Sequence, residues 1–324
     1  MWNADFDFRF DNREYGEPSS MITPSTTLFG ANLSPEIGLG WGYGHSLMVG
    51  MTIPADRESE NFMGEPKFVG YYAYEGKTLS ASLGIFPRKR LFGRYSNAFF
   101  SDTYRFYNPT IKGWLVQYDK PDWFVEMGGD WYSITDPTAS DRFTLFVAGE
   151  SHRGITYAGY TAMLHHYSTE GEVTNTLSDI YVGLDFSSLM QGAELSVQVA
   201  WVNGYQSVGT TAMTNGYEAE VKAKYNYFGL RNTFYKGDDL MPCWNTPCGE
   251  GVVYGEGLYF GEPFYRVGEK GYYNRLELFW EPKMSEGVSL RISSVHHFDG
   301  AHWGWQQTVT LSLNIGSEMF APIR

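Results

Sequence analysis

Residues 303–315 read Trp-Gly-Trp-Gln-Gln-Thr-Val-Thr-Leu-Ser-Leu-Asn-Ile. Apart from Gln307, the odd-numbered positions carry aromatic or aliphatic side chains, and the even-numbered positions carry Gly, Gln, Thr, Ser and Asn. Successive side chains of a β-strand point to opposite faces, so this alternation predicts a strand with one apolar and one polar face. Strands of globular proteins usually have about five or six residues, whereas a strand that crosses a bilayer needs ~9–11.

The same alternation recurs along the whole chain, for example at 192–202, 216–227 and 272–280. About sixteen strands are predicted in this way, and fourteen if one hairpin is lost, because 66–75 and 153–166 alternate poorly. The predicted strands are 2–10, 26–42, 44–53, 66–75, 77–86, 109–118, 122–132, 141–149, 153–166, 176–186, 192–202, 214–226, 228–237, 270–281, 287–298 and 303–315.

The connections between these strands alternate in length. The short ones are 42–44, 76, 119–121, 150–152, 187–191, 227 and 282–286. The long ones are 11–25, 54–65, 87–108, 133–140, 167–175, 203–213 and 238–269, and only 299–302 breaks the trend. Short turns on one side and long loops on the other favour a transmembrane antiparallel up-and-down β-barrel over a sandwich or propeller. We therefore expect one barrel over 1–316, both chain ends on the periplasmic side, and a short periplasmic tail at 317–324.

Composition agrees with this architecture and excludes other classes of protein. Aromatic residues make up 17% of the chain, and the formal net charge of −13 argues against nucleic acid as a partner. Mean hydropathy is −0.33, which an alternating transmembrane strand permits. The opening residues show neither a basic nor an apolar stretch of a signal peptide, so we expect an exported protein in its mature form.

Charged side chains occupy the polar positions of the predicted strands. Unpaired charges are costly in a dry core, so this face is expected to line a water-filled lumen. The predicted lumen wall comprises Glu126, Asp130, Glu218, Glu220, Lys222, Lys224, Arg231, Arg275, Glu277 and Arg291.

The chain resembles the general porins of Gram-negative outer membranes, and its opening resembles porin-like barrels of the Bacteroides group. The local match rests on Asp11–Tyr15, which reads Asp-Asn-Arg-Glu-Tyr, and on Leu33–Leu39, which reads Leu-Ser-Pro-Glu-Ile-Gly-Leu. The resemblance implies an integral outer-membrane protein in contact with lipid and lipopolysaccharide, as a homotrimer or a monomer. One departure is that residues 317–324 follow the last strand, where many such barrels end on an aromatic residue.

The connection 87–108 is strongly basic for an acidic protein. It holds Arg88, Lys89, Arg90, Arg94 and Arg105 against one acid, Asp102, with many aromatic residues between them. By analogy with porins, whose third loop often folds into the lumen, these five residues are predicted to form a pore constriction. Such a constriction would attract anionic solutes, or sugars stacked on the aromatics. The alternative is a packed outer loop that pairs with acidic neighbours or lipopolysaccharide.

The connection 238–269 holds both cysteines, and Cys243 and Cys248 are predicted to form a loop disulfide that braces a cap over the pore mouth. A ligand-binding lid is the alternative. The spacing of its acids matches no EF-hand, and no metal or other cofactor is expected. The pairs His165-His166 and His296-His297 lie in no nucleophile motif and are predicted to be rim residues, so the chain is not expected to be an enzyme.

These observations predict a porin-like outer-membrane channel for passive or weakly selective diffusion of small hydrophilic solutes, anionic or sugar-like among them. Two alternatives stay open. A barrel plugged by its loops would act as a binding or scaffold protein, and a soluble all-β carbohydrate-binding protein would need no membrane.

Overall fold

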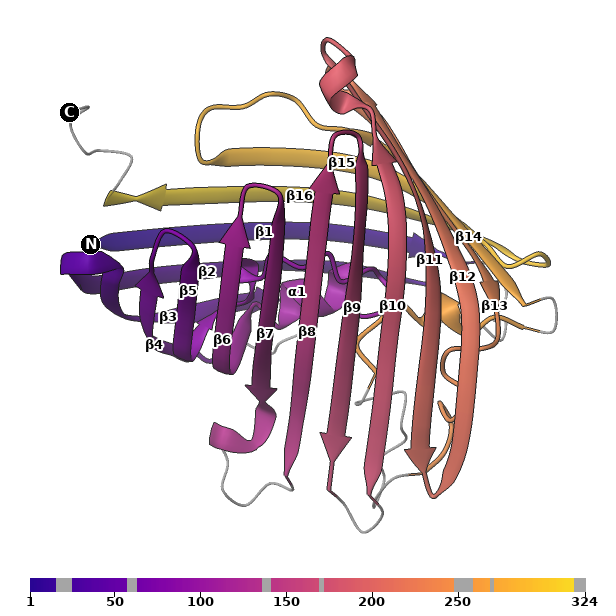
Figure 1. The fold of residues 1–324 in the computed structure, drawn as a ribbon, viewed down its shortest axis with the longest axis horizontal. Coiled ribbons are helices and arrows are strands. Elements are labelled where there is room, and N and C mark those ends of the chain that lie inside the picture. The colour runs from indigo at the N-terminus through magenta and orange to yellow at the C-terminus, as the bar shows by residue number, and fades with distance from the viewer. Residues whose placement is uncertain are drawn as a thin grey trace.

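A computed structural model describes residues 1–15, 25–56, 63–135, 141–168, 172–247, 259–268 and 271–317. Sixteen antiparallel strands form a single closed barrel in which each strand pairs with its neighbours in sequence (Figure 1). The strands are β1 Trp2–Glu14, β2 Thr26–Trp41, β3 His45–Asp56, β4 Lys67–Glu75, β5 Leu79–Pro87, β6 Thr110–Lys120, β7 Trp123–Trp131, β8 Arg142–Arg153, β9 Thr156–Tyr167, β10 Val173–Asp185, β11 Ala193–Val208, β12 Thr210–Tyr225, β13 Phe228–Gly237, β14 Tyr272–Trp280, β15 Val288–Phe298 and β16 Trp303–Gly316.

The barrel closes between the first and last strands. Their register runs from Asn3 opposite Gly316 to Glu14 opposite Trp305, so the alternating C-terminal stretch meets the aromatic-acidic N-terminal one. The predicted closed barrel of sixteen strands is confirmed, including the poorly alternating β4 and β9. Within the described ranges, no helix is long and apolar enough to cross a bilayer.

The two faces of the strands differ as the alternation predicts. On β11, Val199 and Trp201 are 57% and 44% exposed on the outer face. Gln198, directly before Val199, is 6% exposed and faces inward. On β12, Tyr217 points outward and Glu218 and Glu220 are buried inside. The outside of the barrel is therefore apolar and the inside is polar.

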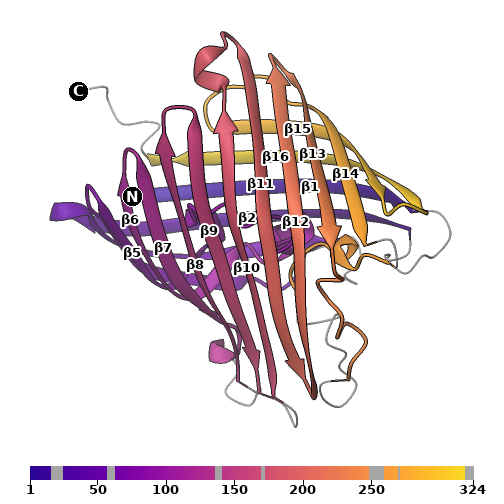
Figure 2. The same cartoon turned by 45° about the vertical axis from the view of Figure 1, so that its right-hand side comes forward.

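The barrel wall is uneven in height. Strands β4, β5 and β7 have nine residues each, whereas β11 and β12 have sixteen. Figures 1 and 2 show the tall wall formed by β8 to β12, which extends toward the side of the long connections. The short turns lie at the opposite rim, where β1 begins and β16 ends.

One local prediction is wrong. Residues 203–213 are no long loop, because β11 and β12 continue through them as a hairpin that turns at Gly209, whose φ of +70° suits glycine. Pro35, which has no backbone N–H to donate, lies inside β2; the β2–β3 ladder is interrupted beside it, and the register is the same before and after. Ser34 and Thr52 join hydroxyl groups at 3.0 Å across that interruption.

Candidate functional site

The connection between β5 and β6 lies inside the barrel. We call residues 88–109 the inserted segment; it contains a short 3-10 turn, Arg88–Arg90, and the helix α1, Asp102–Tyr107. Ser101 caps α1, because its hydroxyl accepts a hydrogen bond from the backbone N–H of Tyr104 at 3.0 Å. In Figure 1, α1 is seen behind β7 and β8, within the ring of strands.

A buried ion pair and two hydrogen bonds hold the inserted segment to β7. The Arg88 guanidinium donates to Asp130 of β7 at 2.6 Å, and both side chains are less than a tenth exposed. Glu126, also on β7, accepts hydrogen bonds from the backbone N–H groups of Phe92 at 2.8 Å and Gly93 at 2.7 Å. One side of the segment is thus fixed by two carboxylates of a single strand.

Other contacts reach the far walls. Arg94 pairs with Glu220 on β12. Asp102 lies 3.5 Å from the guanidinium of Arg275 on β14. Because β7, β12 and β14 surround the lumen, the inserted segment crosses it rather than lining one side.

The electrostatics of α1 follow from these contacts. Burial alone would raise the pKa of Asp102, but the guanidinium groups of Arg275 and Arg9 outweigh burial and hold that pKa below its usual range. Asp102 is therefore a carboxylate that ties the helix to β14.

A second stretch of chain packs against the inserted segment. Residues 259–265, from the connection between β13 and β14, form three hydrogen bonds to it. Ser101 donates its backbone N–H to the Phe260 carbonyl at 2.7 Å, and Glu262 donates to the Asn97 carbonyl at 2.7 Å. The Tyr259 hydroxyl donates to the Ala98 carbonyl at 2.6 Å.

Aromatic rings fill the space around this contact. Phe260 stacks near Tyr104 with ring centroids 4.6 Å apart, and Phe264 lies 3.9 Å from the ring of His297. His297 and His165 are buried inside the barrel, so the prediction of rim histidines is wrong for these two; only His166 and His296 belong to the outer face. The side chains of the second stretch pack against the inserted segment and fill part of the lumen with a core. The periodicity of the sequence does not reveal this contact.

The same core decides what the aromatic residues of 87–108 can do. Tyr95, Phe99 and Phe100 are at most 2% exposed, so these rings are not available to stack on a passing sugar. The sugar prediction is therefore wrong for these three rings and stays a prediction for the other aromatic residues of the segment, of which Phe92 is 46% exposed. Of the segment's aromatic residues, Tyr95, Phe100 and Phe106 line the cavity described next. Phe106 is only partly buried.

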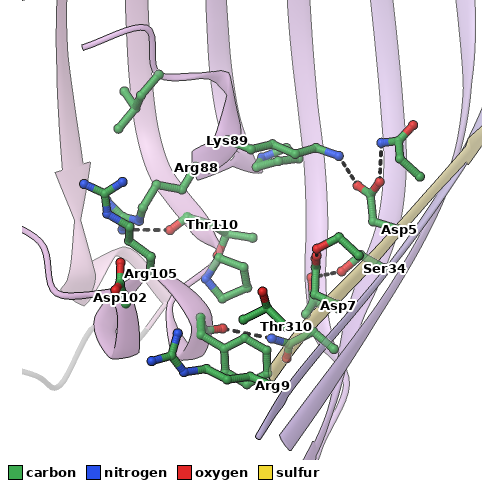
Figure 3. A pocket seen from close by; sticks show the side chains of 18 of the residues that line it. Asp5, Asp7, Arg9, Ser34, Arg88, Lys89, Asp102, Arg105, Thr110 and Thr310 are labelled. Atoms are coloured by element: carbon green, nitrogen blue, oxygen red, sulfur yellow. Dashed lines mark hydrogen bonds and ion pairs between the residues drawn. The ribbon is translucent and has the colours of Figure 1, made fainter. Parts of the chain in front are cut away.

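A cavity of about 620 Å³ remains between the inserted segment and the opposite wall, which is formed by β1, β2, β3 and β16. Asp5 and Asp7 of β1 stand on one side of it, and Arg88 and Arg105 of the inserted segment stand on the other (Figure 3). Lys89 reaches across to pair with Asp5. The charged residues of the lining are Asp5, Asp7, Arg9, Glu36, Arg88, Lys89, Asp102 and Arg105.

The five basic residues predicted for a constriction fall into two groups. Arg88, Lys89 and Arg105 line the cavity. Arg90 pairs with Glu75 of β4, and Arg94 pairs with Glu220, so neither is part of the cavity lining.

The facing acids Asp5, Asp7 and Glu36 were not predicted as site residues. Their signal was present, because Asp5 and Asp7 alternate with Phe6 and Phe8 at the start of the chain.

The residues predicted for the lumen wall face the inside of the barrel. Glu126 and Asp130 bind the inserted segment, Glu218 accepts a hydrogen bond from Tyr265, and the other seven belong to networks of ion pairs. Glu220 accepts from Arg231 at 2.6 Å and lies 3.2 Å from Lys222. A second network joins further residues at 2.8–3.1 Å. It comprises Lys224, Arg275, Glu277, Glu281 and Arg291.

The predicted disulfide lies partly outside the described residues. Cys243 is buried beside Val173 and Val208, and its backbone N–H donates to Gln206 at 3.2 Å. Cys248 is not among the described residues, so the disulfide stays a prediction. In the part of the chain that the structure describes, no group of three or more His, Cys, Asp or Glu side chains is arranged to hold a metal ion.

Solved structures of two bacterial outer-membrane proteins have a similar fold. A triple mutant of the Rhodopseudomonas blastica porin matches with a TM-score of 0.57 at 10% sequence identity, over 97% of this chain and 100% of that one. This chain has the porin fold. The high-pH structure of Pseudomonas putida OprB also matches with a TM-score of 0.57 at 10% identity, over 97% of this chain and 94% of that one. No family model and no curated protein matches the sequence.

Proposed function

We propose that this chain is an outer-membrane channel through which small hydrophilic solutes diffuse. The observation that carries the proposal is the charged cavity left between the inserted segment and the β1, β2, β3 and β16 wall of a barrel with the porin fold. Inserted polar loops narrow a lumen without sealing it, and charges on both sides favour water and hydrophilic solutes over lipid.

The outer surface supports a membrane location. Exposed aromatic residues gather near both rims, with apolar side chains such as Val199 and Leu278 between them. Aromatic belts at the two interfaces and an apolar band between them are typical of outer-membrane barrels. The exposed aromatic residues at the short-turn rim include Trp2, Trp41, Trp123, Tyr225 and Trp280, and those at the long-connection rim include Trp131, Phe298 and Trp303.

This location sets the orientation. Short turns face the periplasm in such barrels, so both termini, including the tail 317–324, belong there in this proposal. The Bacteroides-group assignment rests only on Asp11–Tyr15 and Leu33–Leu39 and is part of the same proposal. Chemical crosslinking in membranes distinguishes a homotrimer from a monomer. In this proposal the chain is a passive channel, which requires no catalytic activity.

Within the channel, we assign the constriction to Arg88, Lys89 and Arg105, with Arg90 and Arg94 holding the segment in place. Glu126 and Asp130 of the lumen wall bind the segment to β7, through backbone hydrogen bonds and through the ion pair with Arg88. Solute selectivity then depends on the few charges that remain free to meet a solute in the cavity.

Planar-bilayer recording tests the proposal. Purified protein, extracted with detergent and reconstituted, is expected to give discrete single-channel steps, and proteoliposomes are expected to swell in small sugars but not in large ones. A barrel that inserts, shown by its mobility shift on unheated gels, and yet gives no conductance would overturn the channel and favour the plugged binding protein.

A further inference from the structure

The acidic side of the cavity carries more negative charge than the protein neutralises. The Lys89 ammonium is bound to Asp5. Asp7 accepts a hydrogen bond from the Ser312 hydroxyl at 2.5 Å, and Glu36 accepts one from the Tyr71 hydroxyl at 3.1 Å. Among the described residues, neither Asp7 nor Glu36 has an ion-pair partner.

Buried atoms without partners mark both sides. Glu36 is 5% exposed, yet its Oε1 has no hydrogen-bond partner in the described part of the chain. Arg88 is 6% exposed, and its Nη1 is likewise unpartnered there, although its other nitrogens are bound to Asp130 and two carbonyls. A buried charged atom without a partner is costly, and both residues line the cavity, so each marks a place for a complementary group of a solute.

Arg105 adds a second basic group opposite the acids. It is exposed within the cavity and donates to the Tyr95 carbonyl, and no ion pair of its side chain occurs within the described ranges. Figure 3 shows Arg105 and Arg88 on one side of the cavity and Asp5 and Asp7 on the other. The cavity is therefore bipolar. Its carboxylates without ion pairs lie on the barrel wall, and the inserted segment offers Arg105, which has no ion pair in the described residues, and the unpartnered Nη1 of Arg88, whose Nη2 pairs with Asp130.

We propose that the cavity binds small zwitterions of the size of an amino acid or a short peptide. The solute's ammonium group faces Glu36 and Asp7, and its carboxylate faces Arg88 and Arg105. Specific small-molecule sites have volumes of roughly 300–1,000 Å³, so 620 Å³ accommodates a di- or tripeptide. This inference rests on the proposed channel for its place in transport, but the binding itself does not require conduction.

The charge pattern selects a zwitterion over other solutes. A simple anion can bind Arg88 and Arg105 but leaves Glu36 without a partner. A simple cation can bind Glu36 and Asp7 but leaves Arg105 without an ion pair. A neutral sugar provides hydroxyl groups to both sides but compensates neither charge. Only a solute with both charges at opposite ends satisfies both sides at once.

Three peptides of nearly equal size test the assignment. Triglycine carries both charges, N-acetyl-triglycine lacks the ammonium group, and triglycine amide lacks the carboxylate. Titration calorimetry in detergent and block of single-channel current are both expected to show triglycine binding about tenfold more tightly than either derivative, since each lost charged contact costs about that factor. Equal affinities for the three peptides would overturn the proposal.

Variants assign each end of the solute. With Glu36→Gln, the preference for triglycine over N-acetyl-triglycine is expected to shrink, and with Glu36→Gln and Asp7→Asn together it is expected to vanish. With Arg105→Gln, the preference for triglycine over triglycine amide is expected to shrink, because only Arg88 remains to meet the carboxylate. Asp119→Asn and Arg153→Gln change exposed charged residues at the short-turn ends of β6 and β8, outside the cavity lining, and are matched controls that leave the preference unchanged. A conducting channel without a triglycine preference defeats only this inference, whereas a silent barrel that binds triglycine by calorimetry defeats only the proposed transport.

Discussion

Gly261 lies where the backbones of the two inserted stretches meet. A Cβ atom placed on it would be 2.1 Å from the carbonyl oxygen of Ala98 and 2.7 Å from its carbonyl carbon. The backbone hydrogen bonds from Glu262 to Asn97 and from Ser101 to Phe260, each 2.7 Å long, flank this point. The Tyr259 hydroxyl, 2.4 Å from the same position, is a side-chain atom, but the Ala98 carbonyl belongs to the backbone and cannot turn aside, so Gly261→Ala forces the two stretches apart.

The size of the effect follows from these contacts. Overpacking a well-packed interior costs about 1–3 kcal/mol, and each lost hydrogen bond costs about 0.5–1.5 kcal/mol. Loss of both flanking bonds brings the expected cost of docking the second stretch to roughly 2–6 kcal/mol. None of these atoms belongs to a strand, so the ladder of the barrel and its resistance to unfolding in unheated detergent should stay as in the wild type.

Single-channel recording and limited proteolysis measure the release. Gly261→Ala is expected to raise the conductance and to speed cleavage in the connection between β13 and β14. Gly42→Ala is the matched control, because a Cβ at Gly42 meets nothing within 4 Å. If Gly261→Ala conducts and resists protease as the control does, the two stretches do not hold each other in the lumen and the reasoning fails.

Three further predictions concern charged groups. Arg88→Met leaves Asp130 as an unpaired buried carboxylate and should lower the free energy of unfolding in urea by about 3–5 kcal/mol. Arg88→Met combined with Asp130→Leu should recover much of that loss. A double variant as unstable as the single one contradicts this. Lys89→Glu should shift the reversal potential in a salt gradient toward cation selectivity, and an unchanged potential argues against a basic constriction. Burial alone would raise the pKa of Asp299, but hydrogen bonds from the backbone N–H groups of its loop and from His302 lower it, so its stabilisation is complete at neutral pH and is lost as the pH falls through its lowered pKa. Wild type should accordingly exceed Asp299→Ala in urea stability at neutral pH, and the gap should close well below the ordinary value of 3.8; a gap that is constant with pH would count against this role.

Strand positions were predictable because the period of two is a local property of the chain. Each outward Val or Trp of β11 and β12 follows from its place in the alternation, as does each inward Glu. The continuation of these strands through 203–213 was missed, because Ser, Thr and Gly there look like loop residues, and the pairing across the hairpin decides otherwise.

The interior of the barrel was harder to predict, because it depends on contacts between distant parts of the chain. Basic residues at 88–105 indicated a loop inside the lumen, but nothing local showed that Phe260 would pack on Phe100 and Phe264 on His297. Without that contact, the aromatic residues looked available to solutes and His297 looked like a rim residue. Asp5 and Asp7 were visible as polar positions of a strand, yet their role emerges only where β1 faces the inserted segment.

The contact between residues 97–101 and 259–265 also bears on the order of assembly. These stretches are about 160 positions apart in the chain, so bringing them together carries a large entropic cost of loop closure unless the strands between them are already paired. We therefore expect the ring of strands to close first and its contents to settle afterwards. A newly inserted barrel would then have a wide, open lumen. Its pore would narrow only when the last aromatic rings pack inside it.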